Sequence, residues 1–238
     1  MSVVSVDSLE KRFGRKQVLK GVSFEVSSSE IFGIIGPNGA GKTTTLRILS
    51  TILTPDSGDA VIMGYSVKDE PDKVRRNISY LPEDAGVYNH LTGYEFLKMM
   101  ADVYGKGINH VKRGMEISGL KSALESPMGS YSKGMKRRIL LAAVLMVEPK
   151  VAILDEPTSG LDVRHAFYIR KTIREYVKTT GASAIISSHN MLEVEYICDR
   201  VAFIDDGKII MEGKPEELKD EFRAENLEEV FAKLIGGM

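Results

Sequence analysis

The sequence predicts an α/β fold in which helices cover a central, mostly parallel sheet. Short apolar runs at 31–35, 151–154 and 184–187 have the length and composition of strands that are buried on both faces. Between the last two runs, apolar side chains recur at helical spacing, at Ala166, Ile169, Ile173 and Val177. This alternation of strand, helix and strand is typical of a parallel sheet with covering helices.

Composition and charge narrow the class of protein. The chain has 238 residues, of which 43% are apolar and 27% are charged, so we expect one large globular domain, 1–238. A formal net charge of -1 gives no general attraction to nucleic acid or to anionic lipid. The single cysteine, Cys198, cannot form an internal disulfide and is expected to be a small buried residue in a helix.

Two further expectations concern membranes and targeting. The longest strongly apolar run, 139–147, is far shorter than the ~20 residues of a membrane-spanning helix. The first residues lack a basic segment followed by a long apolar one, so no signal peptide is expected.

The first sixty residues predict short strands, a glycine-rich turn and one helix. The strand at 31–35 leads into the turn, and 42–50 has a helical pattern. Pro55, Ser57 and Gly58 then indicate a loop.

Residues 84–148 differ from the rest because helical patterns dominate and β-branched runs are few. Thr92 with Glu95 three residues later forms a capping-box pattern that predicts a helix ending near Tyr104. Two further helices are expected, one over 108–118 and one from Ser132 to just before Pro149. The second half of the latter, 140–147, is apolar on all sides and should be buried. We therefore predict a helical subdomain at 84–148.

The C-terminal third returns to strands and then ends in helices. Apolar runs at 201–204 and 208–211 flank Asp206-Gly207, a dipeptide that favours a hairpin turn. The tail after this hairpin is predicted to be helical.

A phosphate-binding loop is the first chemical motif. It fits G-x-x-x-x-G-K-[ST] and consists of Gly36, Pro37, Asn38, Gly39, Ala40, Gly41, Lys42 and Thr43, followed by Thr44. Glycines let backbone N–H groups approach phosphate oxygens, and the helix N-terminus adds its positive dipole end. Lys42 is expected to reach the β- and γ-phosphates, and the Thr43 hydroxyl to ligate Mg²⁺. The alternative is a glycine-rich turn that only opens a helix.

Acidic residues follow the second buried strand. Asp155 and Glu156 stand where parallel strands present ligand-binding groups, so Asp155 is a candidate for holding magnesium and Glu156 for polarising the attacking water. His189 follows the next buried strand and is a candidate for contacting the γ-phosphate. The alternatives are that the acids cap the following helix and that His189 is a surface or capping histidine.

These parts, in this order, resemble the ATP-binding-cassette (ABC) ATPase family over essentially the whole chain. Further matches are Phe13 at the aromatic position that stacks on adenine, Glu83 at the glutamine-loop position, the signature segment 131–135, and the loop 159–162. The resemblance implies a P-loop NTPase fold of the ABC type, with an N-terminal antiparallel β part and an inserted helical subdomain. It also implies ATP and Mg²⁺ as cofactors, with Glu83 near the metal.

The resemblance implies partners as well. Such domains pair head to tail, and ATP lies between the phosphate loop of one copy and Ser132 and Gly134 of the other. A homodimer is sufficient here, and hydrolysis would drive a separate transmembrane permease, which places the chain in the cytoplasm against the inner face of the membrane. The segments 131–135 and 226–231 are similar to the branch that serves drug and antibiotic exporters.

The glutamine-loop position and the signature depart from the family pattern. Glu83 replaces glutamine, and the signature keeps only Ser132 and Gly134, with Lys133 in place of a glycine. The basic residues 136–138 that follow are expected to form a solvated face. Our hypothesis for Lys133 is that it meets the nucleotide held by the partner copy.

Three other functions remain as alternatives. An ABC-type ATPase acting on nucleic acid or ribosomes is disfavoured because there is neither a second cassette nor a basic groove, and nucleic acid is not an expected partner. A GTPase or small-molecule kinase is disfavoured by the signature and by the lack of an Asn-Lys-x-Asp segment. A cassette that binds ATP without hydrolysing it is disfavoured by Glu156 and His189.

Overall fold

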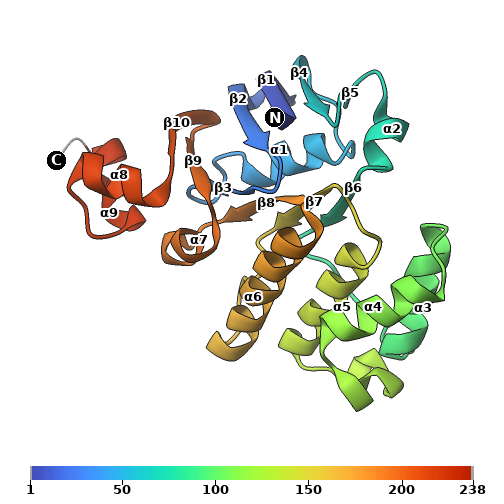
Figure 1. Ribbon diagram of the computed structural model, residues 1–238. Coiled ribbons are helices and arrows are strands. Elements are labelled where there is room, and N and C mark those ends of the chain that lie inside the picture. The colour runs from blue at the N-terminus through green and yellow to red at the C-terminus, as the bar shows by residue number, and fades with distance from the viewer. Residues whose placement is uncertain (1, 237–238) are drawn as a thin grey trace.

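The computed structural model describes residues 2–236 (Figure 1). Residue 1 and residues 237–238, which the expected domain 1–238 includes, lie outside the described residues.

Two sheets form the centre of the molecule. The smaller sheet is antiparallel with strand order β2-β1-β4-β5, and comprises β1 (Ser2–Phe13), β2 (Lys16–Ser27), β4 (Ser57–Ile62) and β5 (Tyr65–Ser66). The larger has the order β10-β9-β3-β8-β7-β6, in which only β10 runs antiparallel. Its strands are β3 (Ile31–Ile35), β6 (Ile78–Leu81), β7 (Val151–Asp155), β8 (Ser183–Ser188), β9 (Arg200–Asp205) and β10 (Lys208–Gly213). The predicted fold class is confirmed.

Helices surround the larger sheet (Figure 1). They are α1 (Lys42–Leu49), α2 (Pro71–Arg75), α3 (Gly93–Val103), α4 (Ile108–Ser118), α5 (Lys133–Leu145), α6 (Val163–Thr180), α7 (Met191–Ile197), α8 (Pro215–Phe222) and α9 (Leu227–Gly236), with 3₁₀ turns η1 (Lys121–Glu125) and η2 (Met128–Ser130). Figure 1 shows α3, α4, α5 and α6 gathered on one side of the sheet, with α1 on the other side, next to the small sheet. The helices expected near 93–104, 108–118 and 133–148 are present, while the division of the chain into a domain and a helical subdomain at 84–148 stays a prediction.

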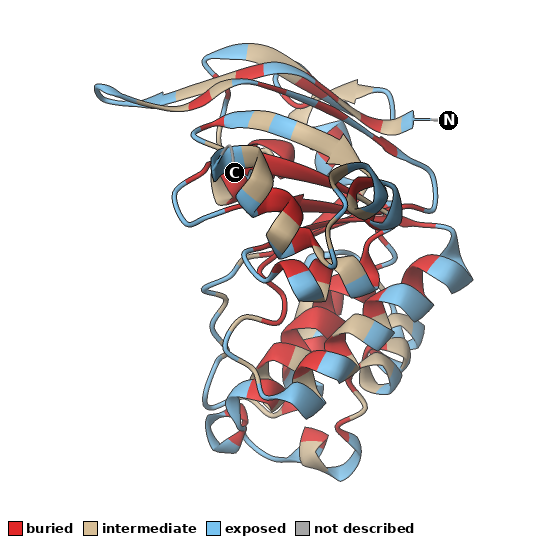
Figure 2. Cartoon of the chain, turned by 90° about the vertical axis from the view of Figure 1, so that its left-hand side faces the viewer, coloured by how far each residue is buried: buried red, intermediate tan, exposed pale blue. Residues whose placement is uncertain are grey.

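The central strands of the large sheet, β3, β7 and β8, are mostly apolar and are buried at every position, on both faces of the sheet. In β3, Ile31 and Ile35 belong to the hydrophobic core under the helices, whereas Phe32 and Ile34 belong to the core between the two sheets. Figure 2 shows buried residues, in red, along the strands at the centre of the molecule and on the inner sides of the helices, with exposed residues on the outside. Uninterrupted burial of this kind explains why the sequence shows apolar runs here and not alternation.

The helix caps and the buried segment that the sequence predicts in the helical region are present. The Thr92 hydroxyl accepts a hydrogen bond from the Glu95 backbone N–H at 3.1 Å, and the Glu95 carboxylate accepts one from the Thr92 N–H at 2.8 Å. Ser132 caps α5 by accepting from the Met135 N–H at 3.2 Å. Every residue from 140 to 147 is buried, as predicted.

The predicted hairpin at Asp206-Gly207 also forms, and it braces the phosphate loop. Both residues have positive φ, 42° and 77°, as this type of tight turn requires. The Gly207 N–H donates to the Ala40 carbonyl at 3.0 Å, and the Gly207 carbonyl accepts from the Lys20 N–H at 2.8 Å. The turn therefore connects the phosphate loop to β2.

Two smaller expectations have different outcomes. Cys198 is buried but lies one residue past the end of α7, so its placement within a helix was wrong by one position. Within residues 2–236, none of the helices is both long enough and apolar enough to cross a bilayer.

Candidate functional site

The phosphate loop connects the end of β3 to the start of α1, and its glycines are required by geometry. A Cβ atom at Gly36 would lie 2.0 Å from the Ile204 carbonyl oxygen, so only glycine fits between β3 and β9. Gly41 has a φ of 114° and stands directly before α1, where no side chain caps the helix. The N-terminal N–H groups of α1 therefore have no side-chain competitor for an anion.

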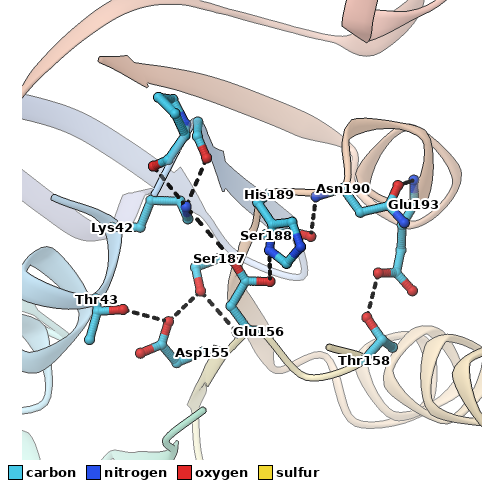
Figure 3. Close-up of polar contacts among 12 residues, drawn as sticks. Lys42, Thr43, Asp155, Glu156, Thr158, Ser187, Ser188, His189, Asn190 and Glu193 are labelled. Atoms are coloured by element: carbon cyan, nitrogen blue, oxygen red, sulfur yellow. Dashed lines mark hydrogen bonds and ion pairs between the residues drawn. The ribbon is translucent and has the colours of Figure 1, made fainter. Parts of the chain in front are cut away.

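Lys42 lies folded over this loop. Its ammonium donates hydrogen bonds to the carbonyls of Gly36 at 2.8 Å and Pro37 at 3.2 Å, and lies 3.7 Å from Glu156 Oε1 (Figure 3). Burial lowers the pKa of Lys42, while the carboxylates of Glu156 and Asp155 act in the opposite direction. A buried ammonium of this kind is placed to meet a phosphate.

A cleft of about 290 Å³ opens above the loop. Its walls are the loop, the second strand of the small sheet and the two acidic segments, through Lys16, Val18, Asn38, Gly39, Gly41, Lys42, Thr43, Thr44, Glu83 and Glu156. The phosphate loop, Glu83 and Glu156, which the sequence predicted to share one site, therefore meet in this cleft.

Asp155 ends β7 beside Thr43, which lines the cleft, and is only 1% exposed. Its Oδ1 accepts hydrogen bonds from the hydroxyls of Thr43 at 3.2 Å and Ser187 at 2.5 Å, and its Oδ2 accepts one from Tyr80 at 3.2 Å. Three hydroxyl donors compensate for the lost hydration of this carboxylate.

Glu156 follows immediately and has a positive φ of 46°. Its backbone N–H donates to Ser187, to the hydroxyl at 3.0 Å and to the carbonyl at 3.2 Å, which fixes the turn. Oε2 lies 2.9 Å from His189 Nδ1 (Figure 3). Burial raises the pKa of Glu156, and the contact with His189 lowers it in part.

The capping alternatives for these residues do not hold. The helix after the acids, α6, is capped by Asp162, whose carboxylate accepts from the His165 N–H at 2.9 Å. The helix after His189 is α7, and Asn190 caps it. Glu156 and His189 instead face each other.

Other predicted site residues lie outside the cleft. Phe13 is 49% exposed at the tip of the β1–β2 hairpin and does not line the cleft, although its cross-strand partner Lys16 does. Ser132 and Gly134 lie at the start of α5 and are not among the residues that line it. Their predicted role concerns the nucleotide of a second copy.

One expectation, a solvated face at 136–138, is wrong for Arg137. This side chain is 8% exposed, and its guanidinium donates to the carbonyls of Asp155, Glu156, Pro157, Pro82 and Glu83 at 2.8–3.2 Å. Burial lowers the pKa of Arg137. In the sequence, only the spacing of Arg137 indicated that it is buried: it follows the buried Gly134 by three residues and so lies on the same face of the helix.

Three further residues were missed by sequence reasoning. Tyr80 and Ser187 bind Asp155 from the neighbouring strands, and burial raises the pKa of Tyr80 to about 12. His165, to which no role was assigned, packs against Gly134 so closely that a Cβ there would lie 2.2 Å from the ring. The sequence could have indicated Tyr80 and Ser187 through their position alone. Each is a hydroxyl residue near the carboxyl end of a strand, at the same edge of the sheet as Asp155.

The donor atoms suit Mg²⁺ bound together with a nucleotide. Thr43 and Asp155 offer hard oxygen atoms at one point of the cleft. Among residues 2–236, no group of three or more His, Cys, Asp or Glu side chains could hold a metal by itself. Mg²⁺ commonly binds through few protein ligands, with phosphates and water supplying the rest.

Comparison with known proteins agrees with this arrangement. A family model described as "ABC transporter" matches residues 19–159, which contain the phosphate loop and both acids. The chain belongs to the ABC transporter family. It is an ATP-binding ATPase subunit of an ABC transporter.

Curated relatives in this family carry resistance and transport names. The chain is 36% identical over 220 residues to the linearmycin resistance ATP-binding protein LnrL of Bacillus subtilis (strain 168), covering 91% of this chain and 70% of that protein. It is 38% identical over 220 residues to the daunorubicin/doxorubicin resistance ATP-binding protein DrrA of Streptomyces peucetius, covering 91% and 66%. The probable multidrug ABC transporter ATP-binding protein YbhF of Escherichia coli (strain K12) is 36% identical, but the chain spans only 42% of it.

Solved ABC structures share the fold over nearly the whole length. An ATP-binding subunit of an ABC transporter matches with a TM-score of 0.87 at 29% identity, covering 98% of this chain and 99% of that one. A dimeric ATP-binding cassette, MJ0796, bound to ADP and phosphate, matches with a TM-score of 0.80, and at 21% identity it bears on the fold alone.

Proposed function

We propose that this ABC ATPase works as a head-to-tail pair of identical copies that powers a separate permease exporting drug-like compounds. The observation that carries the proposal is that Lys42, Thr43 and Glu156 line one cleft, while Asp155 contacts Thr43 and His189 contacts Glu156. Each of these side chains is held by at least one further contact, which is the pre-organisation that phosphoryl transfer needs.

Hydrolysis would begin with the residues around the γ-phosphate. Lys42 stabilises negative charge on the phosphate oxygens, and backbone N–H groups of the phosphate loop and α1 add to it. Glu156 accepts a proton from the attacking water, and its raised pKa makes it a better proton acceptor than an ordinary carboxylate. His189, at 2.9 Å, orients the carboxylate and reaches toward the γ-phosphate.

A magnesium ion would be held by Thr43 directly and by Asp155, with Glu83 at the rim of the cleft. When bound, it would neutralise charge that develops on the phosphate oxygens. The Thr43 hydroxyl and Asp155 Oδ1 are 3.2 Å apart, so both can face a single point between them and the nucleotide.

Pairing would complete the site. Ser132 is exposed at the N-terminus of α5, where its hydroxyl and the adjacent backbone can meet a phosphate held by a partner copy. Phe13 is exposed opposite Lys16, a residue that lines the cleft, and its ring could stack on adenine there.

Export of drug-like compounds and a position on the inner face of the membrane are inferred from the relatives. LnrL and DrrA are named for resistance to linearmycin and to daunorubicin and doxorubicin. An ABC-type ATPase acting on nucleic acid has less support, because the relatives carry resistance and transporter names.

Sedimentation of Glu156→Gln tests the pairing. Removing the base should trap the ATP-bound state, so we expect a monomer that becomes a dimer only with ATP and magnesium. Glu175→Gln, an exposed change on α6, should hydrolyse ATP and show no stable dimer. Adding Lys42→Ala to Glu156→Gln should abolish pairing.

A Glu156→Gln variant that binds ATP and stays monomeric would contradict the homodimer while leaving the phosphate loop intact. Export is tested in inside-out vesicles that contain the chain together with the permease that it is proposed to power. ATP-dependent accumulation of daunorubicin, absent with Glu156→Gln, is the expected result. No ATP-dependent accumulation of any amphipathic drug would contradict the exporter assignment.

A further inference from the structure

A hydroxyl three residues before Glu83 binds the carboxylate that is proposed to hold the metal. Tyr80, on β6, donates a hydrogen bond to Asp155 Oδ2 at 3.2 Å. The other donors to this carboxylate, Thr43 and Ser187, both bind Oδ1. Among residues 2–236, Tyr80 is the only hydrogen-bond donor recorded for Oδ2.

Strand register explains how Tyr80 reaches Asp155. β6 and β7 are parallel neighbours in which Tyr80 stands opposite Ile153, two residues before Asp155. Residues two apart on a strand share a face, so Tyr80, Ile153 and Asp155 all point toward the core between the two sheets. The long phenol side chain spans this single step along the strand.

The separation of donors controls the orientation of the carboxylate. With Oδ2 held from the β6 side, Oδ1 remains directed at Thr43 and the phosphate loop. Without the phenol, the carboxylate plane could rotate about its Cβ–Cγ bond, because such terminal torsions are broad. Groups that orient metal ligands in this way commonly change metal affinity 10–100-fold when removed.

We propose that Tyr80 is a positioning residue of the metal site, whose hydroxyl fixes Asp155 and thereby sets the affinity of the nucleotide complex for divalent cations. The inference rests on the proposed metal role of Asp155. It concerns a position that neither the phosphate loop, the acidic strand end nor the signature contains.

The test is a Mn²⁺ titration followed by electron paramagnetic resonance, with the non-hydrolysable nucleotide AMP-PNP. Tyr80→Phe removes one oxygen atom and keeps the ring, and we expect about 10-fold weaker Mn²⁺ binding. The affinity for AMP-PNP in EDTA should remain that of the unmodified chain, which shows that the cleft is folded.

Tyr176→Phe is the matched control. Tyr176 is buried where Tyr80 is half-buried, its pKa is also raised to about 12, and its hydroxyl donates to the Pro149 carbonyl at 3.1 Å, outside the site. It should leave Mn²⁺ affinity unchanged. Mn²⁺ binding by Tyr80→Phe within twofold of the unmodified chain, or tighter, overturns the inference and leaves the proposed function standing. If the unmodified chain binds AMP-PNP equally well with Mn²⁺ and with EDTA, the proposed metal site fails and the inference with it.

Discussion

Glu156 is held from three directions, which makes its protonation sensitive to each neighbour. Its backbone is fixed in a positive-φ turn by Ser187, and its carboxylate lies between Lys42 and His189. Burial is the largest influence on its pKa and raises it, while His189 acts in the opposite direction. The proposed base is therefore a group whose charge depends on a histidine contact.

This balance predicts the pH dependence of hydrolysis. The ionised form of Glu156 is the active one, so activity should fall as pH drops through its raised pKa. His189→Ala removes a contact that lowers the pKa, so the acid limb should move to higher pH. Activity should also fall at all pH values.

The measurement is the pH profile of kcat/KM for the unmodified chain and for His189→Ala. His110→Ala, which alters a surface contact with Glu148, is the control and should leave the profile in place. An acid limb that stays fixed or moves to lower pH in His189→Ala would show that the contact does not govern Glu156.

At the scale of elements, α5 joins the segments that carry the chemistry. Arg137 projects from this helix and binds backbone carbonyls of the loop after β6 and the loop after β7. The guanidinium suits this role because its donors form a rigid planar fork, whereas a lysine offers a single ammonium. The start of α5 therefore cannot tilt without disturbing Glu83 and Glu156.

We expect Arg137→Lys to destabilise the chain by about 2–3 kcal/mol, because several buried carbonyls lose their donors. Equilibrium denaturation in urea measures this value. Arg164→Lys, on the exposed first turn of α6, should change stability by no more than ~0.5 kcal/mol. Equal stability of the two variants would mean that water replaces the lost bonds without cost.

Arg137 also marks the limit of what the sequence could predict. Features set by neighbours along the chain were predictable, as with the Thr92–Glu95 cap, the hairpin at Asp206-Gly207 and the buried runs of the sheet. Whether Arg137 is solvated depends on how α5 docks against loops that are distant in sequence. The role of Tyr80 could not be predicted for the same reason, because its partner Asp155 lies on β7, a strand that is next to β6 only in the folded sheet.

At the scale of the whole molecule, the proposed pairing would bring the cleft of one copy to the start of α5 in the other. The cleft opens on one side, and the start of α5, with Lys133 beside Gly160, lies outside it. Lys133 stands in the first turn of a helix, where positive charge opposes the helix dipole. A phosphate from a partner copy would offset that repulsion.

Lys133→Ala in the Glu156→Gln background should therefore weaken ATP-driven pairing. A shift of about fivefold or more in the dimer dissociation constant corresponds to the ~1 kcal/mol expected of an exposed charge at a helix end. Sedimentation at several protein concentrations gives this constant, and Lys178→Ala, on the last turn of α6, is the control. Pairing that is unchanged by Lys133→Ala would remove this residue from the interface.

The order of strands in the large sheet has a consequence for synthesis on the ribosome. β3 carries the phosphate loop, yet both of its sheet neighbours, β8 and β9, are translated long after it. At ~5–20 residues per second, roughly 10–30 s separate the emergence of β3 from that of β9. During this interval the nascent chain cannot build the support that Ile204 and Gly207 give to the loop. Nucleotide binding is thus acquired only after β9 has been translated, and ATP cannot stabilise the earlier intermediates.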